Sequence, residues 1–314
     1  MTTVAVTGAS GFVGRHAVRH LSRGGMCRVI ACGRNVEQLR RLGVAYVAED
    51  LKVGRNDCYD LLGRPDRLIH LAWEGLPGYH DPLHLEENLL TSCRFLKNMI
   101  AGGLRSLTVA GTCYEYGMAT GCLAEDAAPA PTTCYAVAKN ALRVFLEALK
   151  KRHPFRLIWT RLFFLYGEGQ HASALIPQVD RALAAGQESF DMSGGEQLRD
   201  YLPVEKASRI LAMIAMQDRY DGIVNICSGK PVSVRRLVED RIALHGGAMR
   251  LNLGVLPYPE YEPMAFWGDA GRLRKIVEES AFADVPHPHD RPYTKSHSKG
   301  RRDDKETTQA HIAP

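Results

Sequence analysis

Tyr135 and Lys139, four residues apart in the run YAVAK, have the residue types and spacing of an acid-base pair. Residues at this spacing project from one face of a helix. A phenol with its usual pKa of about 10 is a poor acid-base group at neutral pH, and an adjacent ammonium favours its ionised form. The pattern occurs by chance in many helices, so it indicates chemistry only together with other residues. One such residue is Thr112, in the run GTCYEYG that follows the apolar stretch 104–110.

A glycine-rich turn, TGASGFVG at residues 7–14, lies between an expected strand, Val4–Val6, and a helix expected to start near Phe12. Glycines permit a tight turn and close backbone approach, and a helix N-terminus offers free N–H groups to a pyrophosphate. A structural turn is the alternative, since any strand-to-helix turn can be rich in glycine. Its position at the first strand-helix junction favours dinucleotide binding, by residues Gly8, Gly11, Phe12, Val13 and Gly14.

Two further positions bear on the adenosine half of a dinucleotide. About twenty residues after the glycine turn, an acidic residue usually binds the ribose 2′-hydroxyl of NAD, whereas an arginine accepts the 2′-phosphate of NADP. The run CGRN places Arg34 there, which favours NADP over NAD; a solvated loop arginine is the alternative. Asp50 and Leu51 end the third expected strand, where the carboxylate could meet the adenine amino group or cap the surface.

Short β-branched runs alternate with amphipathic segments through the first half of the chain, which predicts parallel strands covered by helices on both faces. The expected strands are Val4–Val6, Val29–Cys32, Val44–Ala48, Leu68–Leu71, Leu107–Ala110 and Leu157–Thr160. Helices are expected at Leu85–Ala101, Tyr135–Lys151, Leu175–Ala185 and Glu205–Met216, with a strand at Val224–Cys227 and a helix introduced by Ser233. The fold class is therefore α/β, a Rossmann-type doubly wound parallel sheet with a smaller C-terminal substrate-binding lobe.

The pattern divides the chain into a dinucleotide-binding domain at 1–165, with some later segments interleaved, and a substrate-binding lobe at 166–285. Residues 286–314 are polar and lack apolar periodicity, so we expect a disordered tail.

The composition, 45% hydrophobic and 24% charged, is that of an ordinary globular protein. A net charge of +5 from scattered residues gives little support for a nucleic-acid partner. The eight cysteines form no C-x-x-C pair, which argues against a metal site or a disulfide framework. With no basic leader and no apolar run near ~20 residues, we expect a cytoplasmic protein without a membrane partner.

Together these motifs resemble the extended short-chain dehydrogenase/reductase family, the nucleotide-sugar epimerases, dehydratases and reductases, over residues 3–275. The matching segments stand in the family's order: TGASGFVG 7–14, DL 50–51, HLAW 70–73, ENLLTS 87–92, GTCYEYG 111–117, YAVAK 135–139, RLFFLYG 161–167 and RDYLPV 199–204. The resemblance implies a nucleoside-diphosphate sugar as substrate and, as is common in the family, a homodimer.

By this resemblance Thr112 bonds the reacting oxygen, Tyr135 donates or accepts the proton, and Lys139 lowers the pKa of that phenol and holds the nicotinamide ribose. Asn88 supports the site from its helix, and Leu71 and Ala72 of the HLAW segment lie against the cofactor. The alternative for Thr112 is a turn threonine that bonds its own backbone.

The two residues after Thr112 help to choose among reactions. The family's 4,6-dehydratases have an Asp-Glu pair there, because eliminating water needs an extra acid and base, whereas this chain has Cys113 and Tyr114. Either residue could contact substrate or assist proton transfer, although packing is the simpler role for Cys113. Glu115 comes one place too late and is expected to point elsewhere, so dehydration is disfavoured.

In the second lobe, Arg199 stands where the family commonly places an arginine near the nucleotide diphosphate, a contact that suits a guanidinium. A structural ion pair with Asp200 or Glu205 is the alternative. Phe164 replaces an asparagine that the family often has in RLFFLYG, so the polar contact of that asparagine is lost.

The resulting hypothesis is an NAD(P)-dependent reductase of a nucleoside-diphosphate 4-keto-6-deoxy sugar. An epimerase that retains NAD and uses the same Thr112, Tyr135 and Lys139 is the alternative. A cofactor-sensing regulatory protein would be expected to have lost one of these three residues.

Overall fold

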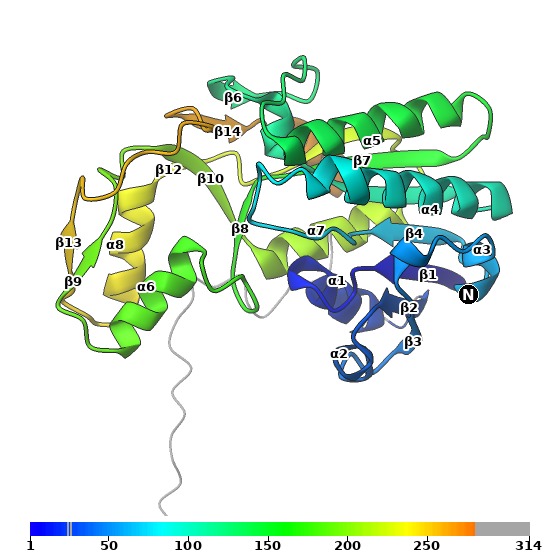
Figure 1. Ribbon diagram of the computed structural model, residues 1–314, viewed down its shortest axis with the longest axis horizontal. Coiled ribbons are helices and arrows are strands. Elements are labelled where there is room, and N and C mark those ends of the chain that lie inside the picture. Colours follow the sequence, from blue (N-terminus) through cyan, green and yellow to red (C-terminus); the bar gives the residue numbers. More distant parts are fainter. Residues whose placement is uncertain (24, 26, 280–314) are drawn as a thin grey trace, which may run out of the picture.

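A seven-stranded parallel sheet forms the centre of the structure, a computed structural model that describes residues 1–23, 25 and 27–279 (Figure 1). The strand order is β11-β7-β5-β4-β1-β2-β3, and every neighbouring pair is parallel. The strands are β1 Thr2–Thr7, β2 Cys27–Gly33, β3 Ala45–Ala48, β4 Arg67–His70, β5 Ser106–Thr112, β7 Arg156–Leu162 and β11 Gly222–Ile226. The predicted Rossmann-type fold is confirmed.

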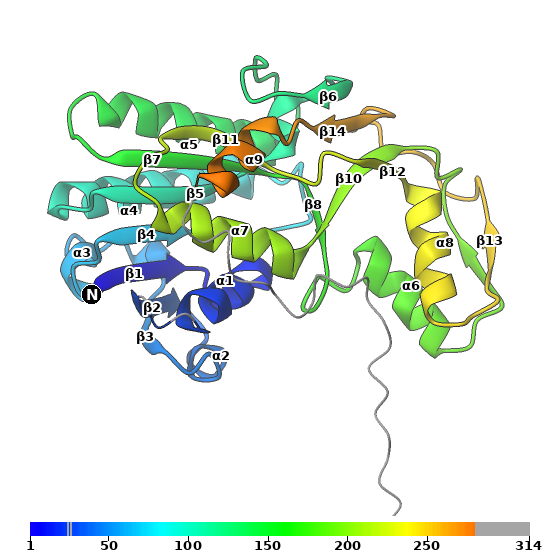
Figure 2. The same ribbon diagram turned by 180° about the vertical axis from the view of Figure 1, so that it is seen from behind.

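Helices cover both faces of this sheet, as a parallel sheet with apolar strands requires. On one face lie α3 (Cys58–Leu61), α4 (Leu89–Gly102) and α5 (Cys134–Lys150); on the other lie α1 (Phe12–Arg23), α7 (Val204–Met216) and α9 (Gly271–Glu278) (Figures 1 and 2). A short α2 (Val36–Arg40) follows β2. The first core joins Phe95, Met99 and Leu142 to the sheet, and the second joins Val18 and Leu211 to it.

The second lobe extends from the carboxyl end of the sheet. It contains the three-stranded sheet β12-β10-β8, two helices and two strand pairs, β9 with β13 and β6 with β14. Their bounds are β6 Gly121–Leu123, β8 Phe164–Tyr166, α6 Leu175–Ala184, β9 Ser189–Asp191, β10 Leu198–Pro203, β12 Pro231–Ser233, α8 Val234–Leu244, β13 Arg250–Asn252 and β14 Phe266–Gly268. Val179 of α6 and Val238 of α8 share its small core.

The two lobes are interleaved along the chain. After β10, the segments α7, β11 and α9 return to the large sheet, so the second lobe is not one continuous run of sequence (Figure 2). The helix expected at Leu85–Ala101 begins instead with a π-helical turn, His84–Asn88. The predicted tail, 286–314, lies outside the described residues.

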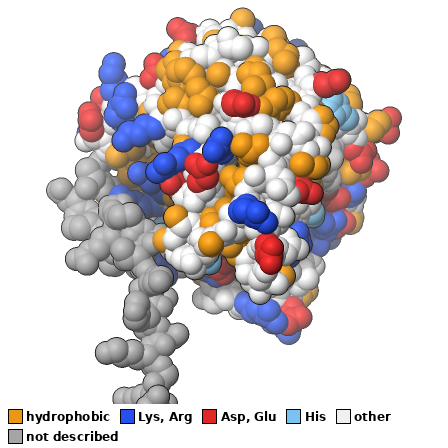
Figure 3. All heavy atoms as spheres, turned by 90° about the vertical axis from the view of Figure 1, so that its left-hand side faces the viewer, with side chains coloured by type: hydrophobic (Ala, Val, Ile, Leu, Met, Phe, Trp, Pro, Cys, Tyr) orange, Lys and Arg blue, Asp and Glu red, His pale blue; other side chains and the backbone are white. Residues whose placement is uncertain are grey.

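The end of the molecule formed by α6, α8, β9 and β13 carries both signs of charge (Figure 3). Lysine and arginine side chains alternate there with acidic and hydrophobic ones. This face therefore lacks the uniform basic surface that a nucleic-acid backbone would require.

Candidate active site

The glycine turn takes a conformation that only glycine accommodates easily. Gly8 has φ 64°, and a Cβ there would stand 2.8 Å from the backbone of Leu71 and Ala72. A Cβ on Gly14 would come within 2.1 Å of the Gly8 carbonyl oxygen. The close backbone packing leaves open space at the N-terminus of α1, where N–H groups can meet a pyrophosphate. The turn therefore fits a dinucleotide.

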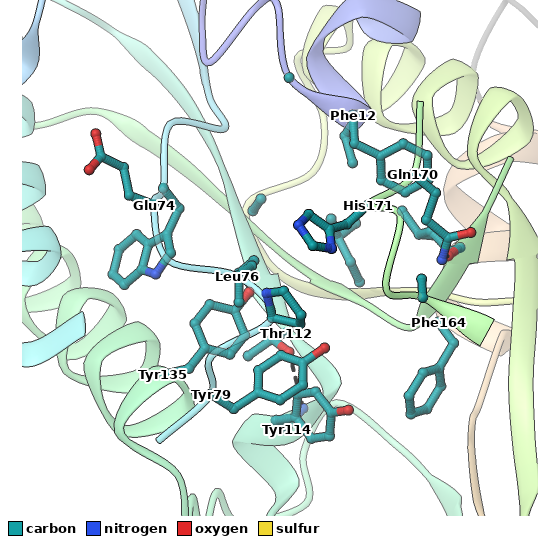
Figure 4. Close-up of a pocket in the computed structure, with 18 of the residues that line it drawn as sticks. Phe12, Glu74, Leu76, Tyr79, Thr112, Tyr114, Tyr135, Phe164, Gln170 and His171 are labelled. Carbon is teal, nitrogen blue, oxygen red and sulfur yellow. Dashed lines mark hydrogen bonds between the residues drawn. The ribbon is translucent and has the colours of Figure 1, made fainter. Parts of the chain in front are cut away.

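A cavity of about 1090 Å³ runs from this turn along the carboxyl ends of the strands to the second lobe (Figure 4). In open α/β sheets, ligands bind at this edge. The cavity is lined by all the residues predicted from the sequence: Gly8, Gly11, Phe12, Val13, Gly14, Arg34, Asp50, Leu51, Leu71, Ala72, Asn88, Thr112, Cys113, Tyr114, Tyr135, Lys139, Phe164 and Arg199. Its size suits a dinucleotide together with a second ligand.

Tyr135 and Lys139 project from the first turns of α5, whose start is capped by the Thr133 hydroxyl, 3.2 Å from the Ala136 N–H. The Lys139 ammonium donates to the Ala110 carbonyl oxygen at 2.8 Å and lies 3.8 Å from the centre of the Trp73 indole. Burial lowers the pKa of Lys139 to about 7. The ammonium and the neutral amine of Lys139 are therefore both populated near neutral pH, and small changes in its surroundings shift the balance.

The phenol of Tyr135 is also buried, and burial raises its pKa. A hydrogen bond with the Thr112 side chain offsets part of this rise. The sequence argument gave more weight to the ammonium, yet Lys139 lies 5.9 Å from the Tyr135 ring, and desolvation is the larger effect. Tyr135 is therefore a neutral phenol, suited to donating a proton.

Thr112 ends β5 and caps the 3₁₀ turn Cys113–Tyr116, its hydroxyl accepting the Tyr114 N–H at 3.3 Å. The turn role and the position beside Tyr135 therefore coexist. Glu115 does point elsewhere, as expected: it is fully buried behind the turn and bonds the Thr112 N–H at 2.9 Å. Figure 4 shows Thr112 surrounded by Tyr79, Tyr114 and Tyr135 at the floor of the cavity.

Asn88 holds the segment that follows β4. Its Nδ2 donates to the Glu74 carbonyl oxygen at 3.1 Å, and its Oδ1 accepts the Glu74 N–H at 3.4 Å. The π-helical turn brings His84 into the same group, where its Nδ1 accepts the Trp73 indole N–H at 3.1 Å. The Asn88 amide nitrogen also lies 3.2 Å from His84 Nδ1, so Asn88 and His84 together hold Trp73 over the ammonium and Glu74 at the cavity wall.

At the adenosine end of the cavity, Arg34 forms an ion pair with Glu74. The same carboxylate lies 3.1 Å from the Lys52 ammonium, and Lys52 also bonds Glu87 at 2.6 Å. Asp50 caps the 3₁₀ turn Leu51–Val53 by accepting the Lys52 N–H at 3.0 Å while it lines the cavity. Arg34 thus has a carboxylate partner, Glu74, that sequence reasoning did not find.

The partner of Arg199 differs from both alternatives predicted from the sequence. Its guanidinium bonds Glu262 at 2.8 and 3.1 Å, whereas Asp200 accepts the backbone N–H groups of Ser228 and Gly229. Glu262 also accepts the Tyr114 hydroxyl. This partner lies 63 positions away in an irregular segment, so no local pattern could have indicated it.

Phe164 packs against Arg199, with 5.6 Å from its ring centre to the guanidinium carbon. Cys113 is buried, and burial raises the pKa of its thiol well above the usual range, which suits a packing role. Two aromatic side chains that sequence reasoning missed, Tyr79 and Tyr261, also line the cavity. Their rings contact each other and Tyr114.

Within the described part of the chain, no three His, Cys, Asp or Glu side chains are arranged to hold a metal ion. All eight cysteines are free thiols. None of the described helices is both long and apolar enough to cross a bilayer.

The structure is a Rossmann-type fold whose cavity runs from the glycine turn to Tyr135, Lys139 and Thr112. The chain belongs to the NAD dependent epimerase/dehydratase family, whose family model matches residues 4–227. It is therefore an NAD-dependent enzyme of the oxidoreductase and epimerase type, as predicted.

The relatives include two whose names specify redox chemistry on a 6-deoxy sugar. The chain is 29% identical to a dTDP-6-deoxy-L-talose 4-dehydrogenase (NAD(+)) from Aggregatibacter actinomycetemcomitans, over 84% of this chain and 98% of the relative. It is 26% identical to a GDP-6-deoxy-D-mannose reductase from Pseudomonas aeruginosa, over 74% and 77%.

Solved structures with the same fold include MoeE5 in complex with UDP-glucuronic acid and NAD, at a TM-score of 0.75 and 28% identity over 87% of this chain and 92% of that one. A UDP-N-acetylglucosamine 4-epimerase from Methanobrevibacter ruminantium shares the fold at a TM-score of 0.78 and 23% identity, over 88% of this chain and 91% of that one.

Proposed function

We propose that the protein interconverts a 4-keto and a 4-hydroxyl group on a nucleoside-diphosphate 6-deoxy sugar, and that it works as a reductase. The observation that carries the proposal is the position of Thr112 and the neutral phenol of Tyr135 on the cavity floor, with the Lys139 ammonium behind them. The names of the talose dehydrogenase and the deoxymannose reductase support it, since each joins a 6-deoxy sugar to carbonyl or alcohol redox chemistry.

A nicotinamide dinucleotide held at the glycine turn, with its nicotinamide near Lys139, would supply or accept the hydride. In the reductase direction the carbonyl oxygen gains negative charge, and Tyr135 donates its phenolic proton to that oxygen. The Thr112 hydroxyl is placed to hydrogen-bond the same oxygen and hold it near the phenol. Lys139 uses one N–H on the Ala110 carbonyl, which leaves two for ligand hydroxyls and keeps positive charge beside the phenolate that forms.

Dehydration is disfavoured for a physical reason beyond the missing Asp-Glu pair. Burial raises the pKa values of both Cys113 and Tyr114, so each is protonated at neutral pH and neither can serve as the base that elimination needs. The cavity-lining carboxylate of Glu262 is engaged by Arg199 and Tyr114.

For the cofactor, we propose NAD(H) rather than the NADP(H) favoured by the sequence argument. Arg34 already has the Glu74 carboxylate as a partner, and a 2′-phosphate would have to displace this group or lie beside it. Like charges at such a distance disfavour one another. The talose dehydrogenase is named as an NAD(+) enzyme and MoeE5 was solved with NAD bound, which supports this choice.

The test is stoichiometric turnover. The purified enzyme is given dTDP-, UDP- and GDP-linked 4-keto-6-deoxy sugars with NADH or NADPH, and oxidation is followed at ~340 nm while the product is identified by NMR. We expect one equivalent of NADH consumed per 4-hydroxy sugar formed. Conversion of a 4-hydroxy sugar to its 4-epimer without added cofactor would establish the epimerase instead. NAD that stays bound through purification would also indicate the epimerase, whereas an empty site that takes up added NADH would agree with the reductase.

A further inference from the structure

A buried ion pair lies directly behind the proposed catalytic floor. Glu115 is fully buried and Arg161 is only 1% exposed, and Arg161 Nε lies 2.9 Å from Glu115 Oε2. The Trp159 indole N–H donates to the same carboxylate at 2.9 and 3.1 Å. The carboxylate therefore has three different donors, counting the Thr112 N–H, and little freedom to move. Burying two charges costs desolvation free energy, and hydrophobic residues of similar volume could fill the same space without that cost. Packing alone therefore does not account for the ion pair.

The carboxylate fixes the conformation of Thr112. It accepts the Thr112 N–H at 2.9 Å, while the Thr112 hydroxyl oxygen accepts the Tyr114 N–H at 3.3 Å. These reciprocal bonds form a capping box that sets both the backbone and the side chain of the threonine. The hydroxyl group can still donate its own hydrogen, to the Tyr135 phenol or to a ligand oxygen.

The space around this carboxylate is filled. A Cβ on Gly111 would lie 2.5 Å from Glu115 Oε1 and 2.2 Å from Trp159 Nε1. The glycine that precedes Thr112 is therefore needed so that the carboxylate and the indole can approach the strand. The run GTCYEYG thus includes both the threonine and the parts that hold it.

The same carboxylate acts on Lys139. The ammonium bonds the Ala110 carbonyl, two residues before Thr112, and the Glu115 charge raises the pKa of Lys139 against the lowering caused by burial. The other titratable groups that face Lys139 are His70, His84 and Tyr135. Burial lowers the pKa of both histidines and raises that of the phenol, so all three are neutral near pH 7.

We propose that Glu115 is a positioning residue of this enzyme: its carboxylate orients Thr112 toward the reacting oxygen and places a buried negative charge at the end of β5, where Lys139 bonds the Ala110 carbonyl. The ion pair with Arg161 holds the carboxylate in place, and the Trp159 indole is an additional donor to it. The proposal rests on the proposed function of the Tyr-Lys-Thr group. It adds Glu115, which does not line the cavity, to the residues on which catalysis depends.

Three variants separate charge from structure. Glu115→Gln removes the charge, Glu115→Asp keeps the charge on a shorter side chain, and Trp159→Phe removes one donor to the carboxylate while leaving the carboxylate itself intact. Removing the Glu115 charge lowers the pKa of Lys139, so the ammonium loses its proton at a lower pH than in wild type. Activity that needs the ammonium then also declines at a lower pH. For Glu115→Gln we expect kcat to fall about tenfold and KM to stay within about twofold. The alkaline limb of the plot of kcat against pH should move to lower pH by roughly one unit.

Glu115→Asp should lose kcat because Thr112 is no longer held, but it should keep the wild-type alkaline limb. Trp159→Phe should keep kcat within about threefold and should also keep the limb. An unshifted limb in Glu115→Gln, or an equal shift in Trp159→Phe, would overturn the proposal. If Glu115→Gln does not fold, the remaining two variants decide: equal kcat losses in Glu115→Asp and Trp159→Phe would reject the orienting role.

A measurement without substrate keeps this inference distinct from the proposed reaction. The ¹³Cε signal of Lys139 in lysine-labelled protein, assigned with Lys139→Arg, is titrated in wild type and in each folded variant. The Lys139 pKa should fall in Glu115→Gln and remain unchanged in Glu115→Asp and Trp159→Phe. That result in an enzyme inactive on every sugar nucleotide would reject the proposed function while retaining the role of Glu115. An unchanged Lys139 pKa in Glu115→Gln would reject the electrostatic role.

Discussion

Arg199 and Glu262 form an ion pair, 2.8 Å from Nη2 to Oε2, with only 2% of the arginine side chain exposed. The guanidinium also donates to two backbone carbonyls, of Leu198 and Met264, so each of its three nitrogens has a partner within the protein. A diphosphate that approaches from the cavity would meet a cation already oriented by its carboxylate partner. This arrangement favours recognition by geometry over attraction by net charge.

The first prediction concerns this arginine. Arg199→Met should weaken binding of a free nucleoside diphosphate by about ten- to a hundredfold, since a hydrogen bond to a charged group contributes roughly 1.5–3 kcal/mol. Isothermal titration with dTDP, UDP and GDP measures the effect. Arg235→Met, which alters an exposed arginine of α8 paired with Glu239, is the matched control and should bind normally. Unchanged affinity in Arg199→Met would leave Arg199 a purely structural role.

Tyr135→Phe tests the proton donor. The variant keeps the ring packing of the cavity floor, so NADH should bind as in wild type, while turnover should fall by roughly 10²–10⁴-fold, the usual contribution of a general acid. Steady-state kinetics and NADH fluorescence titration measure the two quantities. Tyr46→Phe, which alters an exposed phenol on β3, should leave both unchanged. Near-normal turnover in Tyr135→Phe would remove this phenol from the mechanism.

Cofactor choice should depend on the pair formed by Arg34 and Glu74. Removing the carboxylate in Glu74→Gln frees the guanidinium for a 2′-phosphate, so NADPH should bind about tenfold more tightly while NADH changes little. Glu87 is the other carboxylate paired with Lys52, and it does not line the cavity. Glu87→Gln should therefore alter the affinity for neither cofactor. Fluorescence titration of both cofactors against these variants gives the result. Tighter binding of NADPH than NADH by the wild type would restore the NADP assignment.

His70 should make stability depend on pH. It is buried between the Thr7 hydroxyl, at 2.8 Å, and the Ser92 hydroxyl, at 3.3 Å, and burial lowers its pKa to about 3. Below the usual value near ~6.5 the unfolded chain binds a proton that the folded protein does not, so stability falls from there towards pH 3, by up to about 1.4 kcal/mol per pH unit. Above pH 6.5 this contribution is fully present.

The control for that prediction is His70→Asn, which cannot titrate. Urea unfolding between pH 7.5 and 5 should show a steeper loss in wild type than in the variant. Parallel curves for the two proteins would mean that His70 is protonated without cost in the folded state.

A homodimer remains a prediction, and the structure suggests where it could form. Three apolar side chains are exposed on neighbouring helices: Leu90 at the start of α4, by 56%, and Val137 and Val144, seven residues apart on α5, by 37% and 49%. Val144→Glu should convert a dimer to a monomer, as measured by light scattering after gel filtration. Val53→Glu, at a more exposed apolar position outside α4 and α5, should leave the mass unchanged. A monomeric wild-type protein would refute the prediction.

Sequence reasoning succeeded where the signal is local. Periodicity and β-branched runs located the first six strands of the sheet. Five of them are largely buried, and such parallel strands have a distinctive composition; the remaining one, the edge strand β3, is mostly exposed. The spacing of Tyr135 and Lys139 was also enough to place both on one face of α5. The glycines at 8 and 14 were informative because a Cβ at either position would clash with backbone.

The pairings that tune the site could not be predicted in the same way. Glu74, Tyr79 and Glu262 lie in irregular segments rich in Gly and Pro, where position depends on tertiary contacts and no period applies. The competition between burial and charge at Tyr135 also requires the structure, because desolvation depends on everything packed around the phenol.

The Lys139 ammonium lies 3.8 Å from the centre of the Trp73 indole, so the fluorescence of Trp73 should report on the state of the site. A cation over the ring alters the emission of tryptophan, and a reduced nicotinamide nearby absorbs in the range where tryptophan emits. In a Trp159→Phe, Trp267→Phe background, the remaining fluorescence should therefore change both when the ammonium loses its proton and when the cofactor enters. Active-site titration and ligand occupancy can thus be followed in the unlabelled protein, with no coupled assay.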